Sequence, residues 1–523
     1  MTTPASPSAL DCDVAIVGYG PVGAVLANLL GRDGLRVQVF ERDREVYKLP
    51  RAVHFDHEVM RIFQSIDLRD TDLPDTAPIL GYDFINADRE ILFDYDFDRK
   101  VTDQGWRPDY MFHQPDLERA LRAAADARES VSVYLEHEVV GLDEQPDHVA
   151  LEVRDLAAGS ASRTVHAAFA VGCDGASSPV RKWAGLGLDD LEFDEPWLVV
   201  DAMVKRPPTE LGLPACPTQL CDPARPVTFV PVAGPYIRWE FMLLPDERRE
   251  AMLEPLRIEE LIAEWTNPRH VNVIRSAVYD FHALVARRWG TRRVFIAGDA
   301  AHQTPPFLGQ GMCTGIRDVA NLAWKLRLVL AGEAPLALLD HYQPEREPQV
   351  RAVIGIAVDM GRIICTLDPE AAAARDAQFL GREERTLEML AFPPIGPGVR
   401  LDDEEGLAGR LGLQARVKRG DGPVALLDDA FGPGFHLIVQ GPEPPALSER
   451  AAEVLARVEG SLVCIGPDLD VEEAYAKWLD RKGRDAVLVR PDHVVFGSAT
   501  GPDAASALLE ALGGYLTPRK EAA

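Results

Sequence analysis

The chain has 523 residues, of which 46% are hydrophobic and 26% are charged, and its formal net charge at pH 7 is −28. Its length predicts roughly two or three domains, and its acidic charge argues against a nucleic acid or an anionic membrane as a partner. We expect a cytoplasmic protein with no transmembrane helix, because apolar runs of about 18 residues and an N-terminal signal segment are both missing from the sequence. The seven scattered cysteines show no C-x-x-C spacing, which indicates a reducing compartment and neither a metal site nor a redox dithiol.

The stretch Asp13–Glu41 predicts a buried strand, a glycine turn, an amphipathic helix and a second strand that ends on an acid. Gly18 permits a tight turn, Gly20 allows a pyrophosphate to approach the backbone, and Gly23 lets the helix pack closely on the strand. The helix N-terminus offers free N–H groups and a positive dipole end to phosphates, while Glu41 is placed to hold ribose hydroxyls. The stretch therefore predicts a dinucleotide site. Its candidate cofactor contacts are Gly18, Gly20, Pro21, Val22, Gly23, Glu41 and Arg42.

The middle of the chain changes in character. Apolar patterns predict a helix from about His57, two short strands in Tyr82–Phe97, a helix from Gln114 to about Ala127, and a meander of Val131–Leu135, Val139–Leu142 and His148–Val153. Trp197–Leu244 is strand-like and aromatic, which predicts a mostly antiparallel sheet. Further on we expect a buried strand at Val294–Ala297, a helix that begins near Gly315, another from Tyr342 to about Met360, a linker at Phe392–Val399, and a separate small α/β domain from about Gly420.

Two later motifs point to a family. Cys173–Arg181 (CDGASSPVR) and Val294–His302 (VFIAGDAAH), continued by Pro305–Asp318, resemble the "DG" and "GD" motifs of the single-component flavoprotein aromatic hydroxylases. With the glycine pattern, they occur in the order and at the spacing of that family. The resemblance covers nearly the whole chain and is closest to the 3-(3-hydroxyphenyl)propionate hydroxylases. The segments that carry it are Pro50–Phe63, Gln114–Leu121, Cys221–Pro226, Arg238–Met242 and Gly298–Leu326.

The resemblance implies an α/β fold of three parts. These are a Rossmann-like FAD-binding domain of the glutathione-reductase-like and p-hydroxybenzoate-hydroxylase-like type, a mostly antiparallel β-sheet substrate domain, and a C-terminal thioredoxin-like domain. The last part lacks C-x-x-C, which suggests a structural or dimerisation module and hence a homodimer. We expect the FAD-binding domain at 1–80, 105–196 and 285–345, the sheet domain at 81–104 and 197–284, a helical connection and linker at 346–400, and the thioredoxin-like domain at 401–523.

The resemblance also implies FAD as the cofactor and NADH or NADPH as a transient hydride donor. Asp299 can accept from a ribityl hydroxyl, with a turn acid as the alternative, and Arg51 and Gln114 resemble residues that touch the flavin. Arg51 would also give an acidic chain a cation near the pyrophosphate. Asp174 resembles an acid that organises the nearby loop, although an ordinary turn aspartate is the alternative. The glycine-rich stretch after the "GD" motif adds the contacts Gly298, Pro306, Gly309, Gly311 and Met312.

The implied reaction is the ortho-hydroxylation of a phenol by O2 through a flavin C4a-hydroperoxide, with 3-(3-hydroxyphenyl)propionate or 3-hydroxycinnamate as the first substrates expected. Such a reaction needs a dry, apolar pocket and benefits from a base. His54 is the candidate base because its ordinary pKa is near neutrality, and His113 is the second candidate; a satisfied loop histidine is the alternative for both. Relatives tend to carry a small residue at the position of His54. The candidate substrate contacts are Arg225 and Arg238 for a carboxylate, and Tyr236, Trp239 and Phe307 for a ring, with surface and core roles as alternatives.

Other functions compete with this hypothesis. The same fold could hydroxylate a polycyclic polyketide or another phenol, such as resorcinol or hydroxybenzoate. A flavin disulfide reductase or electron-transfer protein would need a dithiol and a second nucleotide fingerprint, and the sequence contains neither. A non-catalytic FAD-binding protein would show eroded motifs, whereas both motifs are intact. The sequence therefore favours a monooxygenase.

Overall fold

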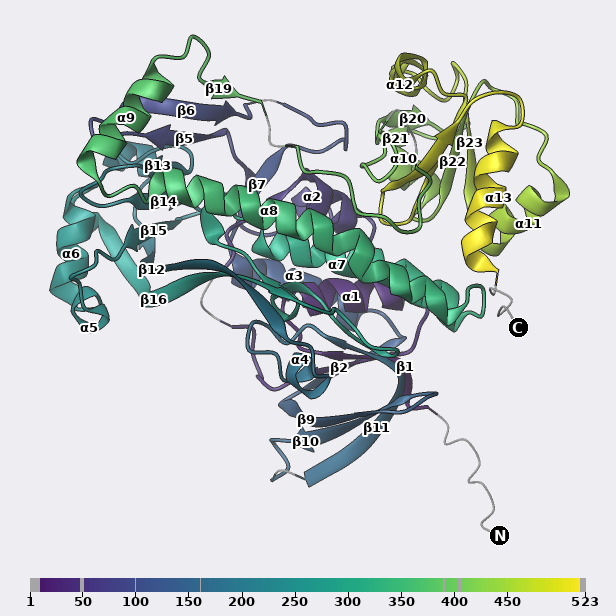
Figure 1. Cartoon of the computed structure of the whole chain (residues 1–523), viewed down its shortest axis with the longest axis horizontal. Helices are drawn as coiled ribbons and strands as arrows, with labels where there is room; N and C mark the ends of the chain where they lie inside the picture. Colours follow the sequence, from purple (N-terminus) through teal and green to yellow (C-terminus); the bar gives the residue numbers. More distant parts are fainter. Residues whose placement is uncertain are drawn as a thin grey trace.

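The computed structural model of the protein describes residues 10–47, 51–98, 100–159, 161–388, 391–402 and 406–517. Figure 1 shows three regions: a sheet near the N-terminus at the bottom, a second sheet at the upper left, and the C-terminal region, in olive and yellow, at the upper right. Among the described residues, every helix is too short or too polar to cross a lipid bilayer.

The opening βαβ unit forms as the sequence predicts. It consists of β1 (Cys12–Val17), α1 (Pro21–Arg32) and β2 (Val37–Glu41), and the two strands pair in parallel. A Cβ on Gly23 would lie 2.1 Å from the carbonyl oxygen of Gly18, so only glycine lets α1 approach the turn this closely. The approach fixes the N-terminus of α1 above the end of β1.

The βαβ unit belongs to a seven-stranded sheet. Its order is β8 (Val131–Leu135), β2, β1, β11 (Ala161–Gly172), β10 (Val149–Asp155) and β9 (His137–Glu144), with β17 (Val294–Ile296) pairing with β11. The prediction of one meander for the segments that form β8, β9 and β10 was wrong for β8. This strand pairs in parallel with β2, at the opposite edge from β9. The preceding helix, α3 (Gln114–Asp126), packs on α1 and delivers the chain to that edge.

A nine-stranded sheet forms the second region and is mostly antiparallel, as predicted. Its order is β18 (His302–Gln303), β16 (Val271–Ala286), β12 (Leu188–Val204), β15 (Tyr236–Met242), β14 (Val227–Pro231), β13 (Thr218–Leu220), β5 (Gly81–Ile85), β6 (Ile91–Asp96) and β19 (Thr386–Leu387). One face packs on α5 (Arg249–Met252) and α6 (Pro255–Ala263) in an apolar core. The opposite face is therefore left to line the site.

Helices and a small sheet join the two regions. The small sheet has the order β3 (His54–Asp56), β7 (Asp109–Phe112), β4 (Thr76–Pro78). The helices are α2 (His57–Gln64), α4 (Pro179–Trp183), α7 (Gly311–Leu330), α8 (Tyr342–Ile364) and α9 (Pro369–Leu380). α7 begins one turn before the predicted Gly315 and is almost entirely buried. Figure 1 shows α8 across the front of the molecule, with its end leading to α9 at the left and its start on the side of the C-terminal region.

The C-terminal region has the predicted thioredoxin-like arrangement. Its elements are β20 (Arg416–Lys418), β21 (Val424–Leu426), α10 (Leu427–Phe431), β22 (His436–Gln440), α11 (Glu449–Arg457), β23 (Ser461–Ile465), α12 (Ala474–Lys482), β24 (Ala486–Val489), β25 (Val495–Ala499) and α13 (Ala504–Leu516). Its sheet has the order β23-β22-β24-β25, with β22 and β23 parallel and the other pairs antiparallel.

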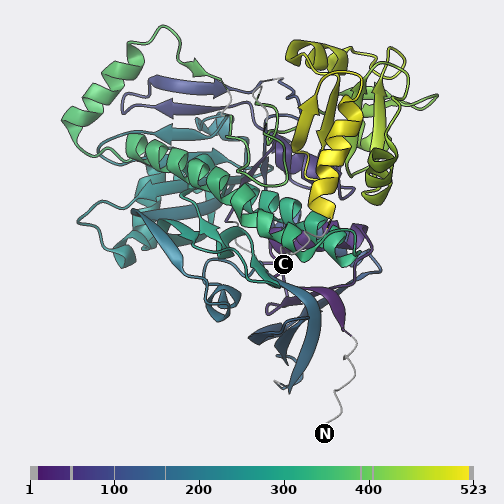
Figure 2. The ribbon, with the colours of Figure 1, turned by 45° about the vertical axis from the view of Figure 1, so that its right-hand side comes forward.

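Both an apolar core and buried charges dock this region. Trp324 and Leu328 of α7 share one apolar core with Leu508 and Leu512 of α13, and Figure 2 shows α13, in yellow, beside the end of α7 and α8. The buried Arg61 guanidinium of α2 lies 2.7 Å from the Asp428 carboxylate of α10. The C-terminal region is therefore packed on α2 and α7.

Candidate active site

A groove of about 440 Å³ runs along the carboxyl ends of β1 and β2. The Tyr19 N–H donates to Glu41 Oε2 over 2.8 Å, so the glycine turn holds this carboxylate at the groove. Gly18 and Arg42 line the same groove, where the largely exposed Arg42 side chain lies 4.0 Å from Asp43. Glu41 therefore lies where the sequence predicts a partner for ribose hydroxyls.

A second cavity, of about 220 Å³, adjoins the groove. It is lined by Gly20, Pro21, Val22, Arg51, Gln114, Asp299, Pro306, Gly309, Gly311 and Met312, together with Ala52, Cys173, Gly175, Ala297 and Thr304. The N-termini of α1 and α7 both open onto it. We call the groove and this second cavity the cofactor cavities.

The bare backbone of these cavities suits FAD. At Gly20 and Gly311 no atom lies within 4 Å of where a Cβ would project, so protein packing does not require glycine there. The Asp299 residue is exposed into the cavity, and its carboxylate makes no hydrogen bond with any residue that the structure describes. FAD requires hydrogen-bond donors for its phosphates, an acceptor for a ribityl hydroxyl and room for a flat ring. The cavities offer free N–H groups at two helix N-termini, the unused Asp299 carboxylate and such a space.

Gln114 and Asp174 organise the loops that border these cavities. The Gln114 Oε1 accepts from the Arg51 and Ala52 N–H groups over 2.6 and 2.7 Å. These bonds hold Arg51 where the two cofactor cavities meet a third cavity. Asp174 accepts from the Ser178 hydroxyl over 2.5 Å and from the Val180 N–H over 3.0 Å, and its burial raises the pKa of the carboxyl.

The third cavity, of about 160 Å³, lies under the nine-stranded sheet and shares Pro306 and Gly309 with the second. We call it the substrate cavity. Its wall is mainly apolar, with Ile79, Phe84, Tyr95, Phe97, Met111, Val230, Leu308 and Met360 among its members. Polar side chains also reach the wall, among them His54, Asp109, Arg238 and Glu240, but the apolar part dominates, as suits hydroxylation chemistry in a pocket that excludes water.

His54 and Asp109 form one polar point of the substrate cavity. The His54 Nε2 lies 2.7 Å from Asp109 Oδ1, and its Nδ1 lies 3.2 Å from the Gly309 carbonyl oxygen. Burial lowers the pKa of His54, but the charge and hydrogen bond of Asp109 outweigh it, and the net shift is upward. Gly309 has a φ of +63°, and a Cβ there would lie 2.6 Å from His54 Nδ1, so this contact depends on glycine.

Arg238 and Glu240 form a second polar point, on β15. The buried Arg238 donates to Asp201 Oδ1 and to the Arg51 carbonyl, both over 2.7 Å, and lies 3.6 Å from Glu240 Oε1. Burial raises the pKa of Glu240 to about 7, against the opposing attraction of Arg238. The only arginine on β15 therefore already has acidic partners.

Comparisons with known proteins agree with this geometry. The family model described as FAD binding domain matches residues 11–357, and the HcaD C-terminal domain model matches residues 409–514. The chain is 38% identical to a "Probable NADH-specific resorcinol 4-hydroxylase" of Rhodococcus jostii, over 93% of this chain and 92% of that one. It is 33% identical to a "3-(3-hydroxy-phenyl)propionate/3-hydroxycinnamic acid hydroxylase" of Burkholderia cenocepacia, over 92% of this chain and 93% of that one. The chain belongs to the FAD-dependent aromatic hydroxylases.

Solved structures support the same fold. A complex of aklavinone-11 hydroxylase with FAD and aklavinone is 25% identical, with a TM-score of 0.79 over 97% of this chain and 99% of that one. The flavin-dependent monooxygenase PieE is 22% identical and has the same fold, with a TM-score of 0.80 over 97% of this chain and 100% of that one. As a member of this family, the protein is a flavoprotein monooxygenase that uses NAD(P)H and O2.

Four of the five predicted substrate contacts of this hydroxylase lie elsewhere, namely Arg225, Tyr236, Trp239 and Phe307. Trp239 is fully buried in the opposite face of the sheet, because neighbouring strand residues point to opposite faces and Arg238 and Glu240 take the cavity face. Phe307 packs edge-on against Trp197 and does not line the cavity. Arg225 is also away from the cavity.

The Arg225 guanidinium is held by both carboxylate oxygens of Glu247, over 2.5 and 2.8 Å, and by the Met242 carbonyl. It therefore stabilises the end of β15 instead of facing a ligand. Of the five predicted substrate contacts, only Arg238 lines the substrate cavity among the described residues.

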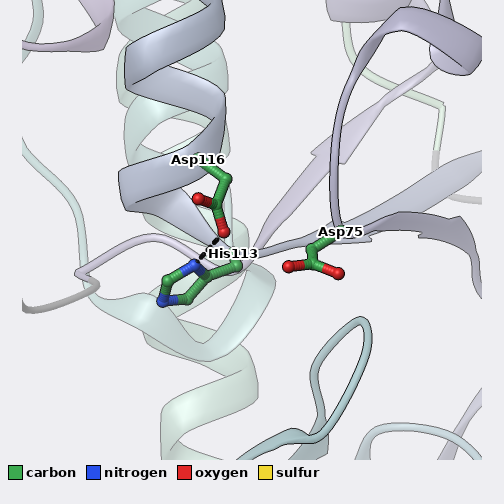
Figure 3. A group of neighbouring side chains, drawn as sticks. All are labelled: Asp75, His113 and Asp116. Carbon is green, nitrogen blue, oxygen red and sulfur yellow. Dashed lines mark hydrogen bonds and ion pairs between the residues drawn. The ribbon is translucent and has the colours of Figure 1, made fainter.

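His113 and Tyr236 lie together outside the cavity. Their rings stack with centroids 3.9 Å apart. Figure 3 shows the His113 ring directed at Asp116, with Asp75 nearby, and the His113 Nδ1 bonds to Asp116. Arg119 pairs with the other oxygen of Asp116, so both carboxylate oxygens of Asp116 have partners within the protein. His113 does not line the substrate cavity, so its position does not fit the predicted role of base. It is the residue that precedes the first turn of α3.

Sequence reasoning missed several polar residues of the substrate cavity. Tyr82 lines it, and its hydroxyl accepts from Gln219 Nε2 over 2.5 Å. Asp109 and Glu240 line it as well. The strand at Tyr82 was predicted, and strict alternation along it could have placed that ring, whereas Asp109 meets His54 only through the pairing of β3 with β7.

Proposed function

We propose that this hydroxylase acts on a small uncharged phenol, with resorcinol as the substrate to test first, and adds one oxygen atom ortho to a hydroxyl with NADH as the reductant. An engineered apolar cavity of about 150 Å³ holds one benzene molecule. A substrate cavity of about 160 Å³ therefore suits a single ring and argues against a polycyclic polyketide.

The observation that carries this proposal is the pairing of the Arg238 cation. Its guanidinium bonds to Asp201 and lies next to Glu240, so a substrate carboxylate would have to compete with two acids that already surround it. The other arginine of the wall, Arg51, also lines both cofactor cavities. A neutral phenol meets no such competition, and the relative at 38% identity carries the name of a resorcinol hydroxylase.

The residues of the chain supply the environment for this reaction. Reduced FAD, when bound, activates O2 for transfer to the ring. The apolar wall excludes water, which protects that transfer. The groups of the wall that can hydrogen-bond the hydroxyls of a phenol include Tyr82, held by Gln219, and the His54–Asp109 pair.

The test is a coupled assay on the purified holoenzyme. NADH oxidation, O2 uptake, H2O2 and the aromatic product are measured with resorcinol, 3-(3-hydroxyphenyl)propionate and NADPH as a comparison reductant. We expect one benzene-1,2,4-triol per NADH with resorcinol and little H2O2. Tight coupling with 3-(3-hydroxyphenyl)propionate and only peroxide with resorcinol would replace this proposal with the phenolic acid, which relatives at 33% identity favour.

A further inference from the structure

The hydrogen bonds of His54 determine its protonation state. Its Nδ1 faces the Gly309 carbonyl oxygen and its Nε2 faces the Asp109 carboxylate, at 3.2 and 2.7 Å. A carbonyl oxygen and a carboxylate can only accept, so both ring nitrogens must carry hydrogen to satisfy both contacts. The ring is then an imidazolium without a lone pair, and a base requires a lone pair. The upward shift in the pKa of His54 is consistent with this state.

Asp109 has the acceptor that His54 lacks. Its Oδ1 bonds to His54, while Oδ2 makes no hydrogen bond with any residue that the structure describes. The carboxylate lines the substrate cavity and its side chain is 14% exposed, so Oδ2 is open to a ligand there. The backbone of Asp109 is fixed by β7, where it pairs with Asp56 of β3.

Two other titratable groups near this pair, Asp56 and Cys313, do not compete for the role. Asp56 of β3 is bonded to Arg317 of α7, and that pairing keeps the pKa of the Asp56 carboxyl below its ordinary value despite burial. The thiol of Cys313, also on α7, is buried, which raises its pKa far above the ordinary range and keeps it neutral. His57, which begins α2, lines the cavity, and its Nδ1 donates to the Pro108 carbonyl over 3.2 Å.

From this geometry we propose that Asp109, and not His54, accepts the proton of the substrate hydroxyl, and that protonated His54 positions Asp109 and balances its charge. The proposal rests on the proposed function, since it needs a phenol in the substrate cavity. As a ring carbon bonds to the transferred oxygen, the O–O bond of the activated O2 breaks and its electron pair leaves with the second oxygen atom. In the same step the phenol O–H bond breaks, its electron pair forms a ring ketone, and the proton passes to Asp109 Oδ2. The attacked carbon then loses its hydrogen as a proton, which passes through solvent to the second oxygen atom, and that atom leaves as water. This loss restores the aromatic ring, and Asp109 returns a proton to the ketone oxygen. FAD, NADH and O2, the reactants of the family, supply the oxygen and the electrons.

The matched variants are Asp109→Asn, which keeps the shape but loses the anionic acceptor, and His54→Gln, which keeps Asp109 but loses the charge. Asp75→Asn is the control, because Asp75 is an exposed acid outside the cavity whose positive φ, 43°, asparagine tolerates. At pH 7, Asp109→Asn should lower hydroxylation of resorcinol about 10²- to 10⁴-fold, while reduction of FAD by NADH stays unchanged. The loss should shrink steeply as the pH rises toward the pKa of a phenol, near 10, since solvent then removes the proton. His54→Gln should cost only about tenfold, the loss of one charge-assisted hydrogen bond.

The opposite order, with a larger loss for His54→Gln and no rescue of Asp109→Asn at high pH, would overturn the proposal. A measurement that does not depend on turnover tests the proposal even if a variant folds poorly. In wild-type protein labelled with 15N-histidine, both nitrogens of His54 should give imidazolium shifts at pH 7, with His54→Gln assigning the signals, and a neutral ring would refute the idea. If no phenol is hydroxylated by the wild type, the proposed function fails; the histidine spectrum and calorimetric binding of resorcinol to the wild type and Asp109→Asn still decide the inference.

Discussion

Glu240 offers a quantitative test of the electrostatics of the substrate cavity. Its side chain is 10% exposed, and burial raises its pKa from 4.5 to about 7. Between these two pH values the folded protein keeps a proton that the unfolded chain has lost, so stability falls as the pH rises and the loss is complete above pH 7. A shift of about 2.5 units corresponds to about 3 kcal/mol, because each pKa unit is worth about 1.4 kcal/mol.

Glu240→Gln removes this titration and preserves the size of the side chain. Relative to the wild type, the free energy of unfolding of the variant should therefore increase by about 2 to 3 kcal/mol between pH 5 and pH 8. Urea denaturation at both pH values, followed by tryptophan fluorescence, measures this difference. Glu210→Gln is the control, since Glu210 is exposed and its replacement should give a difference that does not depend on pH. A Glu240→Gln difference that stays constant within about 0.5 kcal/mol would show that Glu240 is already ionised at pH 5, and the reasoning would be refuted.

Three further predictions concern the cofactor cavities, the His54 contact and the docking of the C-terminal region. Asp299→Ala should weaken FAD binding about tenfold or more through the loss of one charged acceptor, as titration of apoprotein followed by flavin fluorescence would show; an unchanged affinity would place FAD elsewhere. Gly309→Ala should displace His54 and weaken resorcinol binding, measured by calorimetry, whereas Gly332→Ala has the same positive-φ strain with open space around it and should affect stability alone. Arg61→Met should destabilise the protein by about 3 to 5 kcal/mol, because the buried Asp428 carboxylate then faces His436 and His493, whose pKa values burial lowers, in place of a guanidinium cation; limited proteolysis that still spares the C-terminal region would contradict this.

The parts of the fold that local pattern determines were predicted well. The βαβ unit at the N-terminus, α3 and β24 follow from periodicity, glycine placement and helix N-terminal signals that lie within a few residues of each element. The prediction of which strand pairs with β8 was wrong. Strand order depends on where α3 delivers the chain and not on any pattern within Val131–Leu135. Local sequence encodes an element; its place in a sheet is a tertiary property.

The same contrast between local pattern and tertiary placement separates the cofactor cavities from the substrate cavity. The predicted contacts of the cofactor cavities lie in glycine motifs where the backbone itself forms the wall, so the motif already encodes the geometry. Contacts to a substrate come from side chains on one face of a sheet, and a residue and its neighbour cannot both point there. Arg238 and Trp239 are adjacent in β15, so they cannot both be substrate contacts as predicted. Asp109 had no local signal, because its function depends on His54, 55 residues away in the chain.

The pairing of charges explains how a cavity can be dry and still polar at chosen points. His54 of β3 faces Asp109 of β7, and Arg238 of β15 faces Asp201 of β12, so each of these cations is balanced by an acid from a neighbouring strand. Such pairs need no water to stabilise them, and the remaining wall can stay apolar. Under the proposed function, the arrangement would also select the substrate. An anionic ligand would have to displace an acid from its cation, whereas a phenol hydroxyl only needs an acceptor, and the unused oxygen of Asp109 is one.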